Sequence, residues 1–438
     1  MQVKVPNQIL DKVRRIIPFE VYGFITKVVG LTMESTGPYL RVGDLCEVRA
    51  KDVKVLAEVV GFKNERLTLT PLGELRGVSA GARVYPLEER GVPVGEEFLG
   101  RVVSALGTPL DEKPSPYPIL FYPLHGEPLK PLERERIKDV LDVGVKAINA
   151  LITLGKGQRV AILAGSGVGK STLLGMIARY TKAEVNVIAL IGERGREVRE
   201  FLERDLGEEG LKRSVVVVAT SDEPPSLRIR AAFYATALAE YFRDLGMDVL
   251  LLMDSLTRFC MAQREIGLAS GEPPTARGYT PSVFALLPKL LERAGPKINS
   301  GSITGIYTVL VEGDDMNDPI ADAVRSIVDG HIVLSRDLAH QGHYPAIDVL
   351  ASISRVMKDI VPKEHLDVYF KALHILATYR RAEDLINIGA YVKGSNPDID
   401  LALSLIKDLQ AFLRQKIDEA YDFQTSIDLL KGIIANAN

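Results

Sequence analysis

Nine consecutive residues of the sequence, Ala164 to Thr172, have the composition of a phosphate-binding loop. They read Ala-Gly-Ser-Gly-Val-Gly-Lys-Ser-Thr and stand between two apolar runs. Glycines permit positive φ, so successive backbone N–H groups can turn inward around an anion, and a helix that starts at the loop adds its positive end. We therefore expect a strand, a P-loop and a helix that together bind a nucleoside triphosphate.

Each side chain of this loop suggests its own role. Lys170 can reach the β- and γ-phosphates, and the Ser171 hydroxyl can hold Mg²⁺. Ala164 stands where the common pattern has its first glycine. The alternative, a glycine-rich turn that binds nothing, is disfavoured by the strand before it and the helix after it. The residues expected to contact the nucleotide are Gly165, Ser166, Gly167, Val168, Gly169, Lys170, Ser171 and Thr172.

Two acidic residues follow apolar runs further along the chain. Asp254 ends the run 250–253, which is the layout of a Walker B acid that helps to hold Mg²⁺. Glu193 follows the run 187–191, and a carboxylate there can orient and activate the water that attacks the γ-phosphate. Alone, the first run could be an ordinary strand and the second a solvated turn. The P-loop earlier in the same pattern favours the functional interpretation of both.

Several basic residues are weaker candidates. Arg194 and Arg258 could shape the surroundings of the γ-phosphate, and Arg355 could deliver a guanidinium to it, including from a neighbouring subunit. On pattern alone Arg355 is one of many arginines, and a surface role is favoured. His340 and His343 are close in sequence but have no cysteines nearby, so a structural role is the default.

The pattern around these motifs alternates between strand and helix. Continuous apolar runs such as 215–218 and 249–253 indicate strands buried on both faces. This alternation predicts an α/β domain with a parallel sheet between two layers of helices, whose ligands gather at the carboxyl ends of the strands. Strands are expected at 158–163, 185–191, 214–219, 248–253, 303–310 and 331–334, and helices at 170–180, 195–206, 226–245, 282–294 and 319–328.

Different patterns flank this region. Short β-rich runs between turn signals at 19–90 predict a small barrel or sandwich, for which a structural role such as an oligomerisation collar is favoured. Eight prolines mark 91–131 as a crossover segment. Residues 7–17 carry an apolar face at helical spacing, which either lies on its own domain or docks a partner. After 362 only helices are expected, at 363–379, 382–388, 400–415 and 426–434.

Composition limits the remaining possibilities. The 438 residues suffice for two or three domains, and 54 basic against 57 acidic residues give no electrostatic reason to expect nucleic acid as a partner. Two distant cysteines, Cys46 and Cys260, favour neither a disulfide framework nor a zinc site. We find no signal-peptide layout and no apolar run of membrane-spanning length, and we expect a cytosolic protein.

The motifs in order resemble those of the flagellum-specific ATPases of type III protein export, relatives of the rotary ATP synthase catalytic subunit. The resemblance covers about residues 20–438 and is densest from 155 to 360. The matching stretches are residues 164–172, 192–197, 254–258, 274–295, 311–319 and 343–348. The non-catalytic subunit of rotary synthases carries Gln where this chain has Glu193, which argues against a purely regulatory site.

The resemblance implies a fold, an enzyme and site residues. A partner-docking helix (1–18), a β-barrel (19–90), a RecA-like core (91–361) and a helical domain (362–438) are expected. ATP with Mg²⁺ would lie at the subunit interfaces of a homohexamer. Glu193 would be the catalytic carboxylate and Asp254 the Walker B acid. Arg355 would be an arginine finger acting in trans, and Tyr344 the aromatic that packs on adenine.

The resemblance also implies partners and a location. The N-terminal segment would dock a flagellar stator-like regulator, which favours the docking interpretation of 7–17. A stalk-like protein would enter the ring, and the ATPase would deliver export substrates and their chaperones to a membrane export gate. It would thus be cytoplasmic and peripherally associated with the export apparatus at the inner membrane. Three alternatives stay open: a virulence secretion ATPase, a hexameric RNA helicase and a nucleotide sensor that does not hydrolyse.

Overall fold

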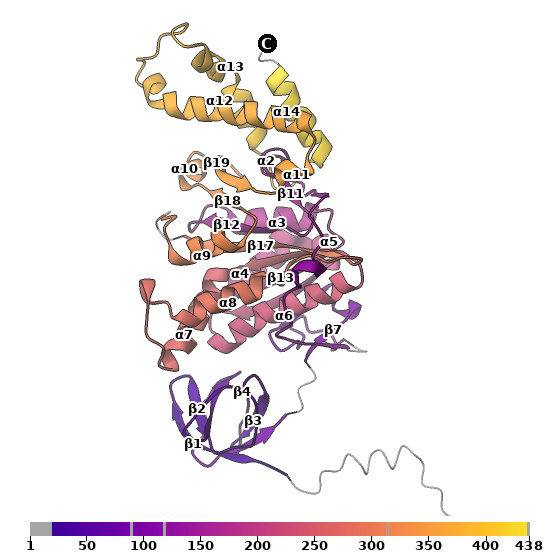
Figure 1. Ribbon diagram of the computed structural model, residues 1–438, viewed down its shortest axis with the longest axis vertical. Helices are drawn as coiled ribbons and strands as arrows, with labels where there is room; N and C mark the ends of the chain where they lie inside the picture. Colours follow the sequence, from indigo (N-terminus) through magenta and orange to yellow (C-terminus); the bar gives the residue numbers. More distant parts are fainter. Residues whose placement is uncertain (1–19, 88–90, 117–119, 312, 314, 436–438) are drawn as a thin grey trace, which may run out of the picture. The chain divides into compact units, whose positions relative to one another are not determined.

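The computed structural model describes residues 20–87, 91–116, 120–311, 313 and 315–435. The helix expected at 7–17 lies outside these residues. Figure 1 follows the chain from the barrel strands to the C-terminal helices. The chain divides into two units that we describe separately: the first holds the barrel, and the second, from Gly91 onward, holds the core sheet and the C-terminal helices.

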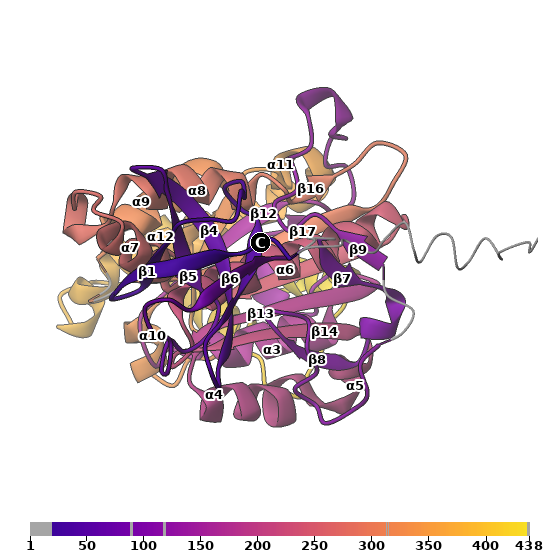
Figure 2. The same ribbon diagram turned by 90° about the horizontal axis from the view of Figure 1, so that it is seen from below.

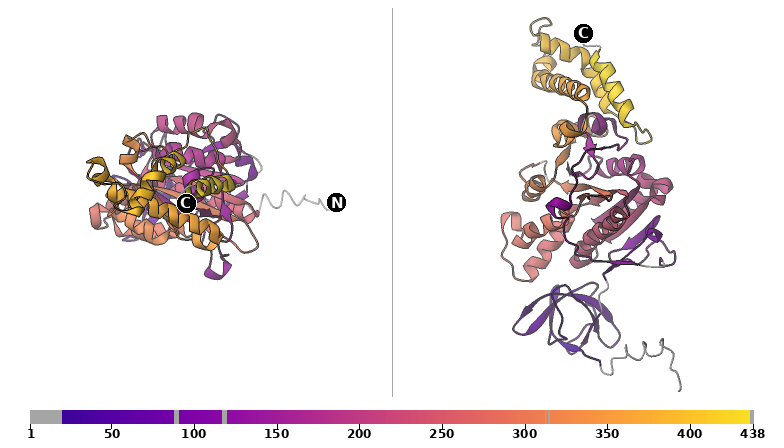
Figure 3. Two further views of the ribbon diagram at one scale, coloured as in Figure 1. Left: turned by 90° about the horizontal axis from the view of Figure 1, so that it is seen from above. Right: turned by 45° about the vertical axis from the view of Figure 1, so that its right-hand side comes forward.

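The first unit is a closed barrel, drawn in indigo in Figure 3. Its strand order is β1-β2-β5-β4-β3-β6. Buried and more exposed residues alternate along its strands, as the inward and outward positions of a barrel require. Side chains such as Met33, Cys46 and Leu69 fill the interior. The expected small barrel is thus confirmed. Its strands are β1 (Gly23–Val29), β2 (Thr32–Ser35), β3 (Leu45–Arg49), β4 (Lys54–Lys63), β5 (Arg66–Pro71) and β6 (Arg83–Pro86).

A core sheet with the order β19-β18-β12-β17-β15-β13-β14-β8 organises the second unit. Pairing is parallel from β18 to β8, whereas β19 is antiparallel to β18 and the short β16 is antiparallel to β17. Nearly every residue of β13 and β15 is buried, which explains their continuous apolar runs. The strands are β8 (Arg101–Ser104), β12 (Arg159–Ala164), β13 (Val185–Glu193), β14 (Ser214–Thr220), β15 (Asp248–Asp254), β16 (Gly295–Pro296), β17 (Ser302–Leu310), β18 (Gly330–Leu334) and β19 (Ile347–Ser354).

Helices cover both faces of this sheet. From β12 to β14 the chain crosses the sheet in one direction, and from β14 to β18 it returns, so right-handed crossovers place the two sets of helices on opposite faces. Figure 1 shows α3 and α6 on these two faces. The first set is α3 (Lys170–Tyr180), α4 (Gly195–Glu200), a π-helical turn (Phe201–Leu206) and α5 (Gly207–Lys212); the second is α6 (Pro225–Asp244), α7 (Leu256–Ala269), α8 (Pro281–Leu291) and α9 (Pro319–Ile327).

The proline-rich segment does more than cross between domains. It contributes β8, which pairs with β14 at one edge of the core sheet (Figure 2). It also contains β7 (Val92–Val94) and β9 (Leu120–Tyr122), which pair with each other. The remaining short elements of the unit are η1 (Glu96–Phe98), η2 (Pro131–Glu133), β10 (Val140–Leu141), α2 (Lys146–Leu151), β11 (Leu154–Gly155), η4 (Ala276–Gly278), α10 (Arg336–His340) and α11 (Met357–Ile360).

The C-terminal region is helical, as expected. It consists of α12 (Lys363–Asn387), α13 (Pro397–Leu413) and α14 (Phe423–Ala435). The two helices expected at 363–379 and 382–388 form the single α12, because no proline or glycine interrupts the sequence between them. The helix α13 starts with the Asn396 side chain as N-cap and a proline at its first position. Leu405 and Leu409 of α13 belong to the same hydrophobic core as Ile148 of α2, so these helices are packed on the core domain.

Candidate nucleotide site

The glycine-rich loop lies where strand β12 passes into helix α3. The strand ends at Ala164 and the helix begins at Lys170. Gly167 and Gly169 have φ of 78° and 87°, a left-handed conformation that side chains rarely adopt. At Gly169 a Cβ would also lie 3.3 Å from the Tyr344 ring. The loop therefore has the backbone that an anion-binding nest at a helix N-terminus requires.

The lysine of this loop lies between two carboxylates. Its Nζ contacts Oδ1 of Asp254 and lies 3.8 Å from Oε1 of Glu193. Strands β13 and β15 are neighbours in the sheet and pair in a register that sets Leu190 opposite Asp254, which brings the two acids to one edge. The Thr308 hydroxyl, from β17, donates a 2.7 Å hydrogen bond to Asp254 Oδ1. The structure thus brings together Lys170, Glu193 and Asp254, which are distant in sequence.

The Glu193 carboxyl is poised to exchange a proton near neutral pH. Burial raises the pKa of Glu193 to about 7, the charge of Asp254 adds to this shift, and Lys170 opposes it. A hydrogen bond with the Glu197 carboxyl favours the protonated form further. A carboxylate with a pKa near the working pH can accept a proton from a reacting water and release it afterwards.

A cavity of about 970 Å³ opens beside the loop. This volume is at the upper end of the range for small-molecule sites. Tyr344, whose side chain is half exposed, lines the cavity together with Gly167 and Gly169 of the loop. Other lining residues belong to the segment that follows α13 and to α2: Gln415, Ile417, Glu419, Tyr421 and Lys146. One cavity thus adjoins both the loop, where phosphates could bind, and the Tyr344 ring, on which a base could pack.

The wall formed by the C-terminal segment is held in place by Gln415. Its Oε1 accepts a hydrogen bond from the Lys146 backbone N–H at 2.9 Å. Its Nε2 donates to the carbonyls of Gly144 and Glu419 at 2.8 and 2.9 Å. Between the rings of Phe412 and Tyr421 lies the ammonium group of Lys146, 5.6 and 4.5 Å from the two centroids.

The sequence offered no sign of this part of the site. Thr308 is one of four hydroxyl-bearing residues in strand β17 and nothing in the sequence distinguishes it. Part of the cavity lining comes from α2 and from residues after α13, far from the motifs. The sequence signal for these cavity-lining residues is limited to aromatic residues, such as Tyr421, next to helical patterns. Packing in a hydrophobic core explains such residues equally well.

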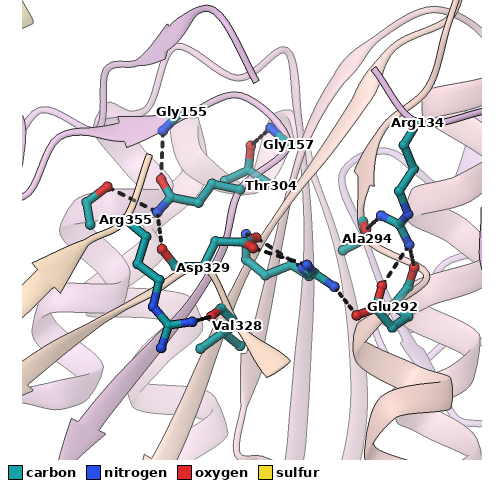
Figure 4. Close-up of polar contacts among 12 residues, drawn as sticks. Arg134, Gly155, Gly157, Glu292, Ala294, Thr304, Val328, Asp329 and Arg355 are labelled. Carbon is teal, nitrogen blue, oxygen red and sulfur yellow. Dashed lines mark hydrogen bonds and ion pairs between the residues drawn. The ribbon is translucent and has the colours of Figure 1, made fainter. Parts of the chain in front are cut away.

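The three candidate arginines lie in different places. Arg194 is not brought to the cluster: its side chain is 76% exposed and its Nη1 lies 2.9 Å from Glu197. Arg258 packs against Gly192, where a Cβ would lie 2.8 Å from the Arg258 Cβ, and its Nε is buried without a hydrogen-bond partner in the described part of the chain. Arg355 follows β19 at the opposite edge of the sheet, where its Nη1 donates to the Val328 carbonyl at 3.2 Å (Figure 4).

Two further findings concern membrane-spanning helices and metal-binding clusters. Within the residues described, no helix has the length and apolar character needed to cross a membrane. Nor does the described part of the chain contain a cluster of three or more His, Cys, Asp or Glu side chains that could hold a metal ion by themselves.

Three family models match the chain in order. Residues 25–88 match the beta-barrel domain and residues 144–354 the nucleotide-binding domain of the ATP synthase alpha/beta family. Residues 361–432 match the C-terminal domain of the type III secretion ATPase EscN. Together these matches cover the barrel, the core sheet with the candidate site, and the C-terminal helices.

Curated relatives resemble the chain over nearly its whole length. It is 52% identical to the flagellum-specific ATP synthase of Bacillus subtilis, over 98% of this chain and 99% of that protein. It is also 52% identical to the flagellum-specific ATP synthase of Salmonella typhimurium, over 93% and 92%. The type 3 secretion system ATPase of Xanthomonas euvesicatoria is 50% identical, over 95% of both chains.

Solved structures agree with these sequence relatives. The assembled ATPase EscN of the enteropathogenic E. coli type III secretion system is 46% identical, covers 94% of this chain and has a TM-score of 0.89. The chain therefore belongs to the ATP synthase alpha/beta family, within its flagellum-specific and type III secretion ATPases. Its enzymatic activity is ATP hydrolysis in the service of type III protein export, and its core is the RecA-like domain expected from the sequence.

Proposed function

We propose that this ATPase drives flagellar protein export as a homohexamer whose active sites are each shared by two subunits. The observation that carries the proposal is the separation of two sets of polar residues. Lys170, Glu193 and Asp254 meet at the carboxyl ends of the strands, whereas Arg355 lies beyond their amino ends. The six residues of β12 between these edges span about 20 Å, too far for Arg355 to reach the phosphates of its own chain.

Within one subunit the loop and the two acids bind and activate the reactants. Lys170 pairs with Asp254, and a bound triphosphate would exchange this contact for its β- and γ-oxygens. Glu193 would orient the attacking water and accept its proton, which its raised pKa permits. The products are ADP and phosphate.

The residues at the loop fit a Mg²⁺ ion bound with the nucleotide. Ser171 is exposed at the first turn of α3, and the Asp254 carboxylate lies at the adjacent strand end. Mg²⁺ commonly takes one or two protein oxygens and completes its shell with phosphate oxygens and water. When bound, the ion would neutralise charge on the phosphates. Ser171 and Asp254 would hold it.

The aromatic wall of the cavity suits the base. Tyr344 lies against Gly169 and lines the same cavity as Tyr421, so an adenine ring can pack on it while the phosphates lie along the loop. Arg355 of the neighbouring subunit would then approach the γ-phosphate from outside, where a guanidinium stabilises the charge of the transition state.

Flagellar export is favoured over virulence secretion by relatives such as the flagellum-specific protein of Bacillus subtilis, which is similar over 98% of this chain. Relatives from type 3 secretion systems have a similar sequence identity, so the preference for flagellar export rests on a small difference in identity. Hexamer formation and a stalk-like partner are supported by EscN, whose structure is known both assembled and in complex with its central stalk EscO. A regulator at the N-terminus, export substrates and a membrane export gate complete the proposed set of partners.

Lys170→Ala provides the direct test of the site. It removes the charge that compensates both carboxylates and the phosphates, so we expect ATP hydrolysis to fall by at least about 1,000-fold. Phosphate release by the purified protein measures this, with Lys182→Ala, outside the loop, as the control. Hydrolysis at the normal rate in the Lys170 variant would disprove the assigned site.

The partner assignment needs a separate experiment. Pull-down from the source cell should recover flagellar export components rather than virulence ones. An RNA helicase, the alternative from another class, predicts hydrolysis that single-stranded RNA strongly stimulates at physiological salt. We expect less than a twofold effect of RNA, because the balanced charge of the chain gives RNA no electrostatic attraction.

A further inference from the structure

Arg355 has a defined position even in a single subunit. Its Nη1 and Nη2 donate to the carbonyls of Val328 and Arg325 at 3.2 and 3.1 Å, which cap the carboxyl end of α9. Its backbone N–H donates to the Asp329 carbonyl at 2.9 Å. A cation at this end of a helix is stabilised by otherwise unsatisfied carbonyls. The direction of the guanidinium therefore depends on where residues 325–329 and the end of β19 lie.

A buried glutamine joins these two segments. Gln158 has no exposed surface. Its Nε2 donates to the Asp329 carbonyl at 3.2 Å and to the Ser354 hydroxyl at 3.1 Å, the residue directly before Arg355. Its Oε1 accepts from the Gly155 N–H at 2.9 Å, and the Ser354 hydroxyl donates to the Thr153 carbonyl at 2.7 Å. Both N–H groups of the Gln158 amide and its oxygen thus bond to three neighbouring segments: Asp329, Ser354 and Gly155.

Asp329 is fixed independently by an arginine. Its two carboxylate oxygens accept from Nε and Nη2 of Arg159, both at 3.1 Å, and Oδ2 also accepts from the Arg159 backbone N–H at 3.0 Å. Arg159 Nη1 lies 2.5 Å from Glu292, which in turn pairs with Arg134 at 3.0 Å. Bidentate pairs of this kind fix orientation as well as distance. Figure 4 shows this chain of contacts running from Arg134 to Arg355.

We propose that Gln158 is a positioning residue for Arg355: its amide sets the end of β19 against Asp329 and thereby aims the guanidinium at the active site of the neighbouring subunit. This inference rests on the proposed shared site. It gives β12 two functions, because Gln158 and Arg159 stand at its start and the phosphate-binding loop at its end. Gln158 touches no reactant and acts through Arg355 alone.

Two variants test the proposal by kinetics. Gln158→Glu keeps the shape but sets an acceptor oxygen against the Asp329 carbonyl, and Ser354→Ala removes the hydroxyl that the amide contacts. Misplacing the guanidinium should lower kcat for ATP by about tenfold in the first and about threefold in the second, because catalytic geometry tolerates little displacement. KM for ATP should stay within twofold of the wild type, since the loop and Tyr344 are unchanged.

Thr304→Val is the matched control. The Thr304 hydroxyl is buried at the same edge and accepts from the Gly157 N–H at 2.8 Å, but it contacts neither Asp329 nor Ser354. It should keep kcat within twofold even where its unfolding temperature falls as far as that of Gln158→Glu. If both test variants kept full kcat, or if Thr304→Val lost as much, the proposal would be wrong.

Mixed hexamers separate an effect on Arg355 from damage to the variant's own loop. Lys170→Ala subunits in large excess hydrolyse nothing but present an intact Arg355 to each variant subunit. The rate per functional loop should then return close to the wild-type value for Gln158→Glu, as it should for Arg355→Ala. Rescue of Arg355→Ala without rescue of Gln158→Glu would place the defect in cis and overturn the inference. Full activity of Arg355→Ala alone would instead overturn the shared site itself.

Discussion

The charged residues near the two ends of strand β12 differ in how they are paired. At its carboxyl end Lys170 lies between Asp254 and Glu193, and Glu193 is held with its pKa raised to about 7. At its amino end Arg159 forms a bidentate pair with Asp329 and a second pair with Glu292. Burial alone lowers the pKa of Arg159, but these two carboxylates raise it above its ordinary value.

The difference separates binding from positioning. A charge that must exchange its partner for a phosphate, or release a proton, needs surroundings in which both of its states are accessible. A charge that holds backbone in place gains from complete and directional pairing. We call the carboxyl end of β12, with Lys170, the reactive edge, and its amino end, with Arg159, the rigid edge. Variants at the reactive edge should change catalysis, and variants at the rigid edge should change stability.

The largest effect is expected at the reactive edge. Glu193→Gln keeps the shape and hydrogen bonding but cannot accept a proton, so kcat should fall by about 1,000-fold or more. ATP affinity should change little, because Lys170 and the loop remain. Single-turnover hydrolysis and nucleotide titration measure the two quantities. A kcat within tenfold of the wild type would assign the catalytic carboxylate to another residue.

At the rigid edge a variant should cost stability. Asp329→Asn removes the charged, bidentate partner of the largely buried Arg159 guanidinium and leaves it only the contact with Glu292, so the free energy of unfolding should fall by about 3 kcal/mol. Denaturant titration measures it. The control is Glu203→Gln, which breaks the exposed pair with Arg199 and should cost less than about 0.5 kcal/mol. Equal effects of the two variants would show that the amino edge is not the rigid one.

The raised pKa of Glu193 predicts a stability effect of opposite sign. The unfolded carboxyl loses its proton near its ordinary pKa of 4.5 and the folded one near 7, so the folded state binds more protons between these values. Wild-type stability should therefore fall as pH rises from about 4.5 to 7, whereas Glu193→Gln lacks this loss. At pH 8 the variant should be more stable by about 3 kcal/mol. Thermal unfolding at pH 5 and pH 8 checks the difference, and equal curves at both pH values would contradict it.

A smaller effect is expected at the aromatic wall. Tyr344→Ala removes the ring that lines the cavity beside Gly169, so KM for ATP should rise about tenfold with kcat nearly unchanged. Tyr344→Phe retains the ring and should behave as the wild type. A loss confined to kcat in Tyr344→Ala would show that the ring orients the phosphates instead of binding the base.

The smallest effect is expected for Arg194. Its exposed guanidinium pairs with Glu197 on α4 and lies apart from the reactive cluster, so Arg194→Ala should change kcat and KM by less than about twofold. Steady-state hydrolysis is a sufficient measurement. A tenfold loss of kcat would show that this arginine enters the site when ATP binds.

Local sequence patterns predicted the elements that carry the reactive edge. The apolar runs before the loop, before Glu193 and before Asp254 each form a parallel strand close to its expected bounds. Buried strands of this kind have a continuous apolar signature that irregular segments lack. Strand β8 was missed because prolines surround it, and α7 because its sequence was interpreted as a motif following Asp254.

The rigid edge and the cavity wall had no comparable signature. Gln158 and Ser354 are separated by 196 positions, and a Gln or a Ser in a sequence does not by itself predict a buried hydrogen bond. The Arg159–Asp329 pair likewise becomes visible only when β12 and β18 are side by side. Such contacts join residues far apart in sequence. They can be predicted only once the order of the strands in the sheet is known, and no single segment of the sequence gives that order.

The attachment of Gln415 to α2 has a consequence for the C-terminal helices. Because Gln415 and Tyr421 close the cavity that begins at Gly167, a nucleotide filling it would contact the core and the C-terminal segment at once. Binding and docking are then thermodynamically linked, and each strengthens the other by the same factor. At a concentration 100 times Kd, the ligand would add at most about 2.7 kcal/mol to the stability of this closed arrangement, because the loop also binds phosphate without the C-terminal segment. Each cycle of hydrolysis and product release would thus weaken and then restore the contact between the core domain and the C-terminal helices α12, α13 and α14.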